Sequence, residues 1–319
     1  MSGRWSRNYL MAVSIILHHY PQSPVAEKVR VVLGLKALAW NSVEIPRLPP
    51  KPDLMPLTGG YRRTPVLQIG AEIYCDSQCI IRELERRYPT PTLYPDRSAG
   101  ISWAVSRWTD GPLFNLVLSA VLGAAADTLP EEFACDRGRL YFGPNYDLHA
   151  LRDDLPHTLA QLRAQLGWID ERFNDGRAYM LGAQPGLPDV LCYYLIWFLR
   201  GRYERGPELL GQFENFSAWE GRIRRLGHGD LRALTPGEAL AIARRCNPDV
   251  TESVDPLDPQ QLRPGMRVTI VPEGDGGDPP VMGDIVRTAI DQVAIRRSDP
   301  QVGNVVVHFP RVGYRISVA

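Results

Sequence analysis

The stretch RRTPVLQIGAEIYCDSQCIIREL, residues 62–84, predicts two short strands that pass directly into a helix. The strands are expected at Pro65–Ile69 and Glu72–Tyr74, because Gly70-Ala71 between them has the spacing of a hairpin turn. Asp76-Ser77 then opens the helix, since both residue types are favoured at helix starts. This arrangement indicates a small mixed sheet with a helix on its face.

The residues before this stretch show the same alternation of strand and helix. Ser14–His19 is an apolar run of strand length, and Val25–Leu38 places apolar side chains at helical spacing. Trp40–Ile45 alternates like a second strand, and three prolines in residues 47–53 then interrupt regular structure. The order β-α-β, loop, β-β-α predicts an α/β domain over residues 13–90.

The rest of the chain divides into a helical block and a strand-rich end. Every periodic signal from about residue 99 onward is helical, which predicts an all-α domain over residues 98–248. Five short β-type runs separated by turn residues then predict a small barrel-like all-β domain over residues 260–319. Residues 1–12 are expected to be a flexible leader. Within the helical block we expect a buried central helix at Val190–Leu199 and a first long helix marked by Trp103, Trp108, Leu113 and Leu116.

Charge and cysteine content exclude several classes of function. The chain of 319 residues has 36 Lys and Arg against 36 Asp and Glu, so nothing points to nucleic acid or a membrane as a partner. Its five cysteines are widely spread, and neither a disulfide framework nor a metal site is expected. His18 and His19 are adjacent on a strand, so they point to opposite faces and cannot form one ligand pair. With no signal-like or membrane-spanning segment, we expect a cytoplasmic location.

The stretch YPQSPVAEKVR, residues 20–30, places a hydroxyl at the junction of a strand and a helix. Serine is a favoured N-cap and proline suits the first helical turn, so Ser23-Pro24 starts a helix on any interpretation. The N-terminus of a helix also favours an anion. Ser23 is therefore either a cap alone or a cap that also serves a bound anion.

Three stretches together resemble the glutathione transferase superfamily over roughly residues 14–248: YPQSPVAEKVRVVL (20–33), the stretch at 62–84, and LGAQPGLPDVLCYYL (181–195). The resemblance implies a thioredoxin-like fold for the α/β domain and an all-helical second domain. It also implies a serine-type glutathione transferase that activates glutathione as a co-substrate for attack on an electrophilic small molecule. A homodimer is expected from the resemblance alone.

The resemblance assigns roles to individual residues. Ser23 would hold the glutathione thiolate, with Tyr20 as the rival hydroxyl. Thr64-Pro65 would be a cis-proline motif whose Thr64 backbone pairs with the cysteinyl backbone of glutathione. Asp76 and Ser77 would bind the ammonium and the carboxylate of the γ-glutamyl group. The glycyl carboxylate would face Arg63 and Lys51.

Asp189 resembles the helix-start signature of the family's helical domain. It stands at the third helical position after a cap at Gly186, where the family usually has Ser or Thr, so half of the capping box is missing. An alternative function stays open: a non-catalytic scaffold on the same fold that uses the C-terminal β domain for protein interaction. A thiol-disulfide reductase is disfavoured because Ser23 stands where such enzymes have cysteine.

Overall fold

The computed structural model describes residues 14–274 and 276–319, so the leader predicted at 1–12 lies outside the described residues. The chain forms two compact units. Of the described residues, the first unit contains 14–29, 38–84 and 230–319, and we call it the sheet unit. The second unit contains residues 30–37 and 85–229, and we call it the helical unit.

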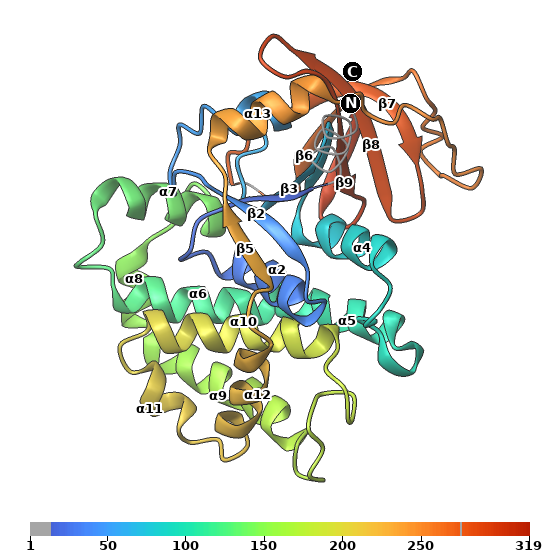
Figure 1. Ribbon diagram of the computed structural model, residues 1–319. Helices are drawn as coiled ribbons and strands as arrows, with labels where there is room; N and C mark the ends of the chain where they lie inside the picture. The colour runs from blue at the N-terminus through green and yellow to red at the C-terminus, as the bar shows by residue number, and fades with distance from the viewer. Residues whose placement is uncertain (1–13, 275) are drawn as a thin grey trace. The chain divides into compact units, whose positions relative to one another are not determined.

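The sheet unit is built on one continuous sheet, which has ten strands within the described residues (Figure 1). The strand order is β10-β6-β7-β8-β9-β4-β3-β1-β2-β5. The strands are β1 (Ile15–His19), β2 (Ala39–Glu44), β3 (Val66–Ile69), β4 (Glu72–Cys75), β5 (Asp230–Ala233), β6 (Arg267–Pro272), β7 (Val281–Thr288), β8 (Gln292–Asp299), β9 (Gly303–Pro310) and β10 (Tyr314–Val318).

The N-terminal part of this sheet has the predicted thioredoxin-like arrangement. Strand β1 pairs in parallel with β2 and antiparallel with β3, and β3 forms the predicted hairpin with β4. Helix α2 (Pro24–Leu35) follows β1, and helix α4 (Ser77–Arg87) follows β4. The short helix α3 (Met55–Thr58) lies in the proline-rich connection and was not predicted. Both strand-to-helix junctions therefore fall where Ser23-Pro24 and Asp76-Ser77 predict them.

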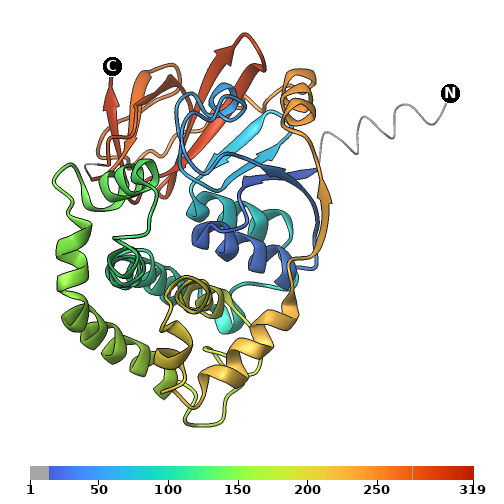
Figure 2. The ribbon, with the colours of Figure 1, turned by 90° about the vertical axis from the view of Figure 1, so that its left-hand side faces the viewer.

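All five C-terminal strands are present, and they continue the N-terminal sheet. Strand β9 pairs in parallel with β4, with Ile73 opposite Val307 and Tyr74 opposite His308. In Figures 1 and 2 the red strands of residues 281–310 continue the sheet from the cyan strands β3 and β4 of the N-terminal part. A single apolar core joins Ile16 and Ile73 to C-terminal residues such as Phe309. The strand-rich end is thus part of the sheet unit.

The segment after the helical block also returns to the sheet. Strand β5 pairs in parallel with β2, and helix α13 (Pro236–Arg245) buries Ala239, Ile242 and Ala243 in the same core. The sequence suggests no strand here, because β5 is short and its four side chains are exposed. The helical unit ends at residue 229.

The helical unit contains the helices drawn from green to yellow in Figure 2. The predicted first long helix is wrong: it is two helices, because Gly111 and Pro112 interrupt it and proline starts the second one. The predicted central helix, Val190–Leu199, is buried as expected. No helix in residues 14–274 or 276–319 is long and apolar enough to cross a membrane. The helices are α5 (Ala99–Thr109), α6 (Pro112–Ala124), α7 (Glu131–Phe142), α8 (Leu148–Asp153), α9 (Leu155–Glu171), α10 (Leu187–Arg202), α11 (Gly206–Leu210) and α12 (Phe216–Leu226).

Candidate functional site

Ser23 forms the start of α2. Its Oγ accepts a hydrogen bond from the Ala26 backbone N–H at 3.1 Å, and its backbone carbonyl accepts one from Glu27 N–H at 3.0 Å. The side chain is therefore the predicted N-cap, in a residue that is 2% exposed. Because this bond uses the hydroxyl only as an acceptor, the hydroxyl hydrogen is left to donate to an anion.

The Thr64–Pro65 bond is cis, as the resemblance implies. Lys51, 5% exposed, donates from Nζ to Thr64 Oγ1 at 3.1 Å. The same Nζ lies 5.8 Å from the centroid of the Tyr20 ring, within the range of a cation–π contact. Tyr20 is in turn joined to Ser23, because its carbonyl accepts the Ser23 N–H at 3.1 Å. The structure thus brings Tyr20, Ser23, Lys51 and Thr64 into one connected group.

The start of α4 is fixed by Asp76 and Ser77. Asp76 has a φ of 72°, in the left-handed region that aspartate tolerates better than most residues. Its Oδ1 accepts the Gln78 N–H at 2.8 Å, a cap of the α4 N-terminus. Ser77 is the first residue of α4 and is buried. The predicted capping role is therefore filled by the Asp76 side chain.

The second oxygen of Asp76 has a partner that the sequence does not reveal. Tyr314, the first residue of β10, donates to Asp76 Oδ2 at 3.0 Å. The Tyr314 and Tyr61 hydroxyl oxygens are 3.2 Å apart. Burial, and then the charge of Asp76, raise the pKa of both tyrosines well above the ordinary value, so both stay neutral. Asp76 therefore faces a neutral hydrogen-bond donor.

Arg63 also has a partner in the C-terminal part of the chain. Its Nε and Nη2 donate to Asp278 Oδ2 at 3.1 and 2.6 Å. Asp278 lies between β6 and β7, and its side chain is 5% exposed. Burial opposes the charge of Arg63, but the Asp278 carboxylate outweighs it and raises the pKa of the guanidinium. The two basic residues predicted for the glycyl carboxylate thus have different partners, Thr64 for Lys51 and Asp278 for Arg63.

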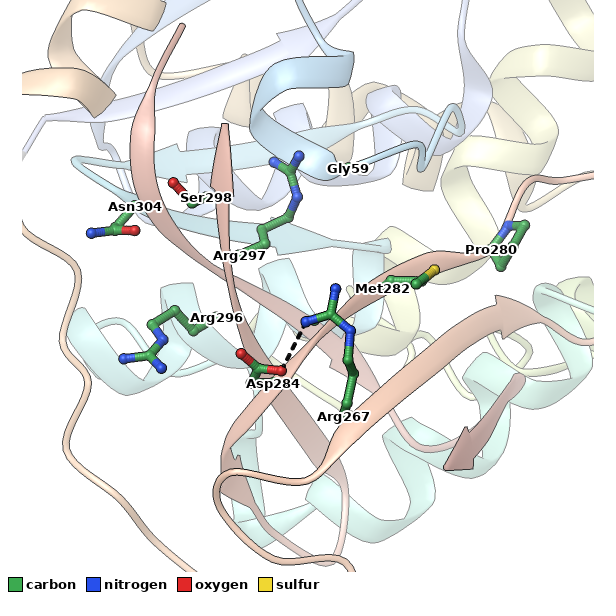
Figure 3. A pocket seen from close by; sticks show the side chains of 10 residues that line it. Gly59, Arg267, Pro280, Met282, Asp284, Arg296, Arg297, Ser298 and Asn304 are labelled. Atoms are coloured by element: carbon green, nitrogen blue, oxygen red, sulfur yellow. Dashed lines mark hydrogen bonds and ion pairs between the residues drawn. The ribbon is translucent and has the colours of Figure 1, made fainter. Parts of the chain in front are cut away.

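A separate hollow of about 620 Å³ lies over the C-terminal strands (Figure 3). Two of its arginines are held by the protein. Arg267 pairs with Asp284 at 3.1 Å, and Arg297 donates to the carbonyl of Pro56 in α3. Figure 3 shows Arg297 directed toward Gly59, where an added Cβ would lie 2.5 Å from the guanidinium. The sequence-predicted site residues do not line this hollow. In the described part of the chain, no cluster of three or more His, Cys, Asp or Glu side chains is placed to hold a metal ion.

Comparisons with known proteins find similarity to glutathione S-transferases. The family model for the N-terminal domain of glutathione S-transferases matches residues 17–92. A GST-like protein from Pseudomonas syringae is 33% identical with a TM-score of 0.75, over 96% of this chain and 99% of that chain. The match includes most of the C-terminal strands, because the uncovered 4% of this chain is much shorter than the segment from β6 to β10.

More distant structures share the fold alone. FzlA from C. crescentus is 22% identical with a TM-score of 0.50, over 72% of this chain and 92% of its own. A glutathione S-transferase from Rhodospirillum rubrum is 18% identical with a TM-score of 0.51, over 66% of this chain and 87% of its own. The search of curated proteins gives no match.

Proposed function

The chain belongs to the glutathione S-transferase superfamily, and from this we propose that it is a serine-type glutathione transferase in which Ser23 stabilises the thiolate. The observation that carries the proposal is the bonding of Ser23. Its Oγ is fixed by the Ala26 N–H at the start of α2 while its own hydrogen stays available. A homodimer is part of the same proposal and rests on the resemblance, and the cytoplasmic location stays a prediction from the sequence.

Glutathione would be held by the two helix starts and the cis-proline turn. The Thr64 backbone before the cis bond would pair with the cysteinyl residue. The N-terminus of α4, with Ser77, would bind the γ-glutamyl carboxylate, because a helix N-terminus offers unpaired N–H groups and a favourable dipole. Asp76 would face the ammonium, since the partner of its Oδ2 in the described part of the chain is the neutral Tyr314 hydroxyl.

The reaction needs a thiolate, because a neutral thiol is a weak nucleophile. A hydrogen bond from the Ser23 hydroxyl and the dipole of α2 would both favour the charged sulfur and lower its pKa. The thiol proton would pass to solvent. The sulfur electron pair would form a bond to an electrophilic carbon, and the leaving group would depart with its own bonding pair.

The test compares Ser23→Ala with Ser23→Gly. Alanine removes both the cap and the hydroxyl, whereas glycine is a tolerated cap that lacks only the hydroxyl. We expect both variants to lose about 100-fold in kcat/KM with a chloronitroarene, the size typical of a lost hydrogen bond to developing charge. The dissociation constant for glutathione, measured by calorimetry, should change less than about threefold, because the thiol binds in both protonation states.

Three results would contradict the proposal. Wild-type turnover in both variants removes Ser23 from the mechanism, and the same experiment with Tyr20→Phe would then test the rival hydroxyl. Loss of activity in Ser23→Ala but not in Ser23→Gly assigns Ser23 to capping alone. Lack of glutathione binding at millimolar ligand in the wild-type protein favours a non-catalytic scaffold.

A further inference from the structure

The C-terminal part of the chain, through β10 and the loop before β7, contributes side chains to both ends of the proposed glutathione site. Tyr314 of β10 bonds to Asp76, which would face the ammonium of the γ-glutamyl group. Asp278, before β7, bonds to Arg63, which would face the glycyl carboxylate. Neither residue lies within residues 17–92, which the family model for the glutathione S-transferase N-terminal domain matches. The inference below rests on the proposed function and concerns which thiol the site accepts.

The two contacts differ in charge. Tyr314 is neutral, so its hydrogen bond leaves the negative charge of Asp76 in place for an ammonium group. Asp278 carries the opposite charge to Arg63, so its contact offsets the positive charge that a carboxylate would need. The C-terminal strands therefore preserve one ligand-binding charge and compensate the other.

The geometry at Arg63 strengthens this difference. Asp278 Oδ2 accepts from both Nε and Nη2, which are the paired donors that arginine uses to bind a carboxylate in two-pronged fashion. Its Oδ1 lies 3.5 Å from Nε of Arg62. The Asp278 side chain is 5% exposed, so water screens the contact weakly. A carboxylate from a ligand would have to displace Asp278 or approach beside it.

We propose that Asp278 is a specificity-determining residue: it weakens the binding of a thiol ligand that carries a free carboxylate at its glycyl end. The class of ligand favoured is a γ-glutamyl thiol whose other end is uncharged, as in an ester or amide of glutathione. Glutathione itself still binds through its γ-glutamyl and cysteinyl parts. Its glycyl carboxylate gains little affinity from Arg63, because Arg63 is already paired with Asp278.

The experiment measures the dissociation constants of glutathione and of its glycyl ethyl ester by calorimetry, on the full-length protein. In the wild type we expect the ester to bind at least as tightly as glutathione. In Asp278→Asn we expect glutathione to bind about tenfold more tightly, in line with a restored charge-assisted pair, while the ester changes less than about twofold. The ratio of the two dissociation constants therefore measures how much Asp278 weakens the binding of the ligand carboxylate.

Asp284→Asn is the matched control. It removes the same charge from the neighbouring strand β7, where Asp284 pairs with Arg267 at 3.1 Å, and should leave both constants unchanged. Circular dichroism checks that each variant is folded. If Asp278→Asn does not fold, the two dissociation constants of the wild-type protein test the inference. Glutathione binding more than threefold more tightly than its ester would then overturn it.

The outcomes separate the inference from the function on which it rests. The same ratio of constants in wild type and Asp278→Asn, with both ligands bound, overturns the specificity role and leaves the proposed transferase standing. A change of equal size in Asp284→Asn overturns it too, because the effect is then one of net charge. Absence of binding for both ligands in every variant overturns the proposed function and this inference together.

Discussion

His18 is kept uncharged by its burial inside the sheet unit, where its ring makes a hydrogen bond to Gln68. It is 1% exposed, and its Nε2 donates to Gln68 Oε1 at 2.9 Å. The Gln68 amide nitrogen in turn donates to the carbonyls of Gly70 and Ala239, at 3.0 and 2.9 Å, which fixes its oxygen as the acceptor. Within the described residues, Nδ1 of His18 has no hydrogen-bond partner. Burial lowers the pKa of His18 from 6.5 to about 4.

This histidine makes stability depend on pH in a definite direction. The unfolded chain takes up a proton on His18 below pH 6.5, whereas the folded protein does so only near pH 4. The contribution of the neutral His18 to the stability of the folded protein is therefore complete above pH 6.5. It is lost as the pH falls toward 4, which lowers the free energy of unfolding by about 3 kcal/mol in all. When the pH falls from 7.5 to 5.0, we expect the free energy of unfolding of His18→Gln to decrease by about 2 kcal/mol less than that of the wild type. Urea unfolding at both pH values measures the difference.

A control for this prediction is His149→Gln, which changes an exposed histidine of the helical unit. Its unfolding free energy should follow the wild-type pH dependence. Equal pH dependence in His18→Gln and the wild type would show that His18 is protonated to the same extent in the folded and unfolded states.

Single residues were predictable from sequence where the decisive contact is local. The caps at Ser23 and Asp76 depend on N–H groups two or three residues away, at Ala26 and Gln78. The opposite directions of His18 and His19 follow from strand geometry, and the structure gives them different partners, Gln68 and Ser42. Asp278 and Tyr314 could not be predicted, because more than 200 residues separate them from Arg63 and Asp76.

At the scale of a helix, Asp189 ties the start of α10 to two other segments of the helical unit. Its Oδ2 accepts the Gly186 N–H at 2.9 Å, which is the half of the capping box that the sequence predicts. Its Oδ1 accepts the N–H groups of Met180 and of the Trp219 ring, each at 2.8 Å. Glycine at the cap also leaves room for Pro95, because a Cβ on residue 186 would lie 2.9 Å from Pro95 Cδ.

We expect Asp189→Asn to destabilise the protein by about 3 kcal/mol, since an amide offers one acceptor to three donors and points its own N–H groups at a buried donor. Urea unfolding of the full-length protein measures the loss. Asp154→Asn is the control, because Asp154 stands at the start of α9 without a side-chain cap and should change stability by less than about 0.5 kcal/mol. Losses of similar size in both variants would contradict a special role for Asp189.

Helices and strands were predictable where their ends are marked by local chemistry, as at Ser23-Pro24 and in the turns between the C-terminal strands. The break at Gly111-Pro112 was missed because apolar spacing continues across it, from Trp108 to Leu113. Strand β5 was missed for a different reason. Its exposed residues acquire strand structure by pairing with β2, about 190 residues earlier, and no local pattern encodes that pairing.

At the scale of the whole sheet unit, β4 and β9 join its N-terminal and C-terminal strands, and a buried polar cluster reinforces the join. Glu72 on β4 accepts from His308 Nε2 at 2.6 Å, from the Asp249 N–H at 2.7 Å and from Arg287 Nη2 at 3.3 Å. The His308 ring stacks on Tyr74, with the ring centroids 4.2 Å apart. A strand-rich end was predictable from its turns, whereas its pairing with β4 depends on these long-range contacts.

Because the core and the polar cluster cross this join, we expect the N-terminal and C-terminal strands to unfold as one cooperative unit. Hydrogen exchange read by mass spectrometry at increasing urea should show peptides from β4 and β9 losing protection at the same concentration. Glu72→Gln weakens three hydrogen bonds to a buried carboxylate and should lower that shared midpoint, at a cost of about 2–3 kcal/mol. The exposed Glu252→Gln should leave it unchanged. If β9 lost protection well before β4, the C-terminal strands would be a separate folding unit, and Asp278 and Tyr314 could leave Arg63 and Asp76 without unfolding the rest of the sheet.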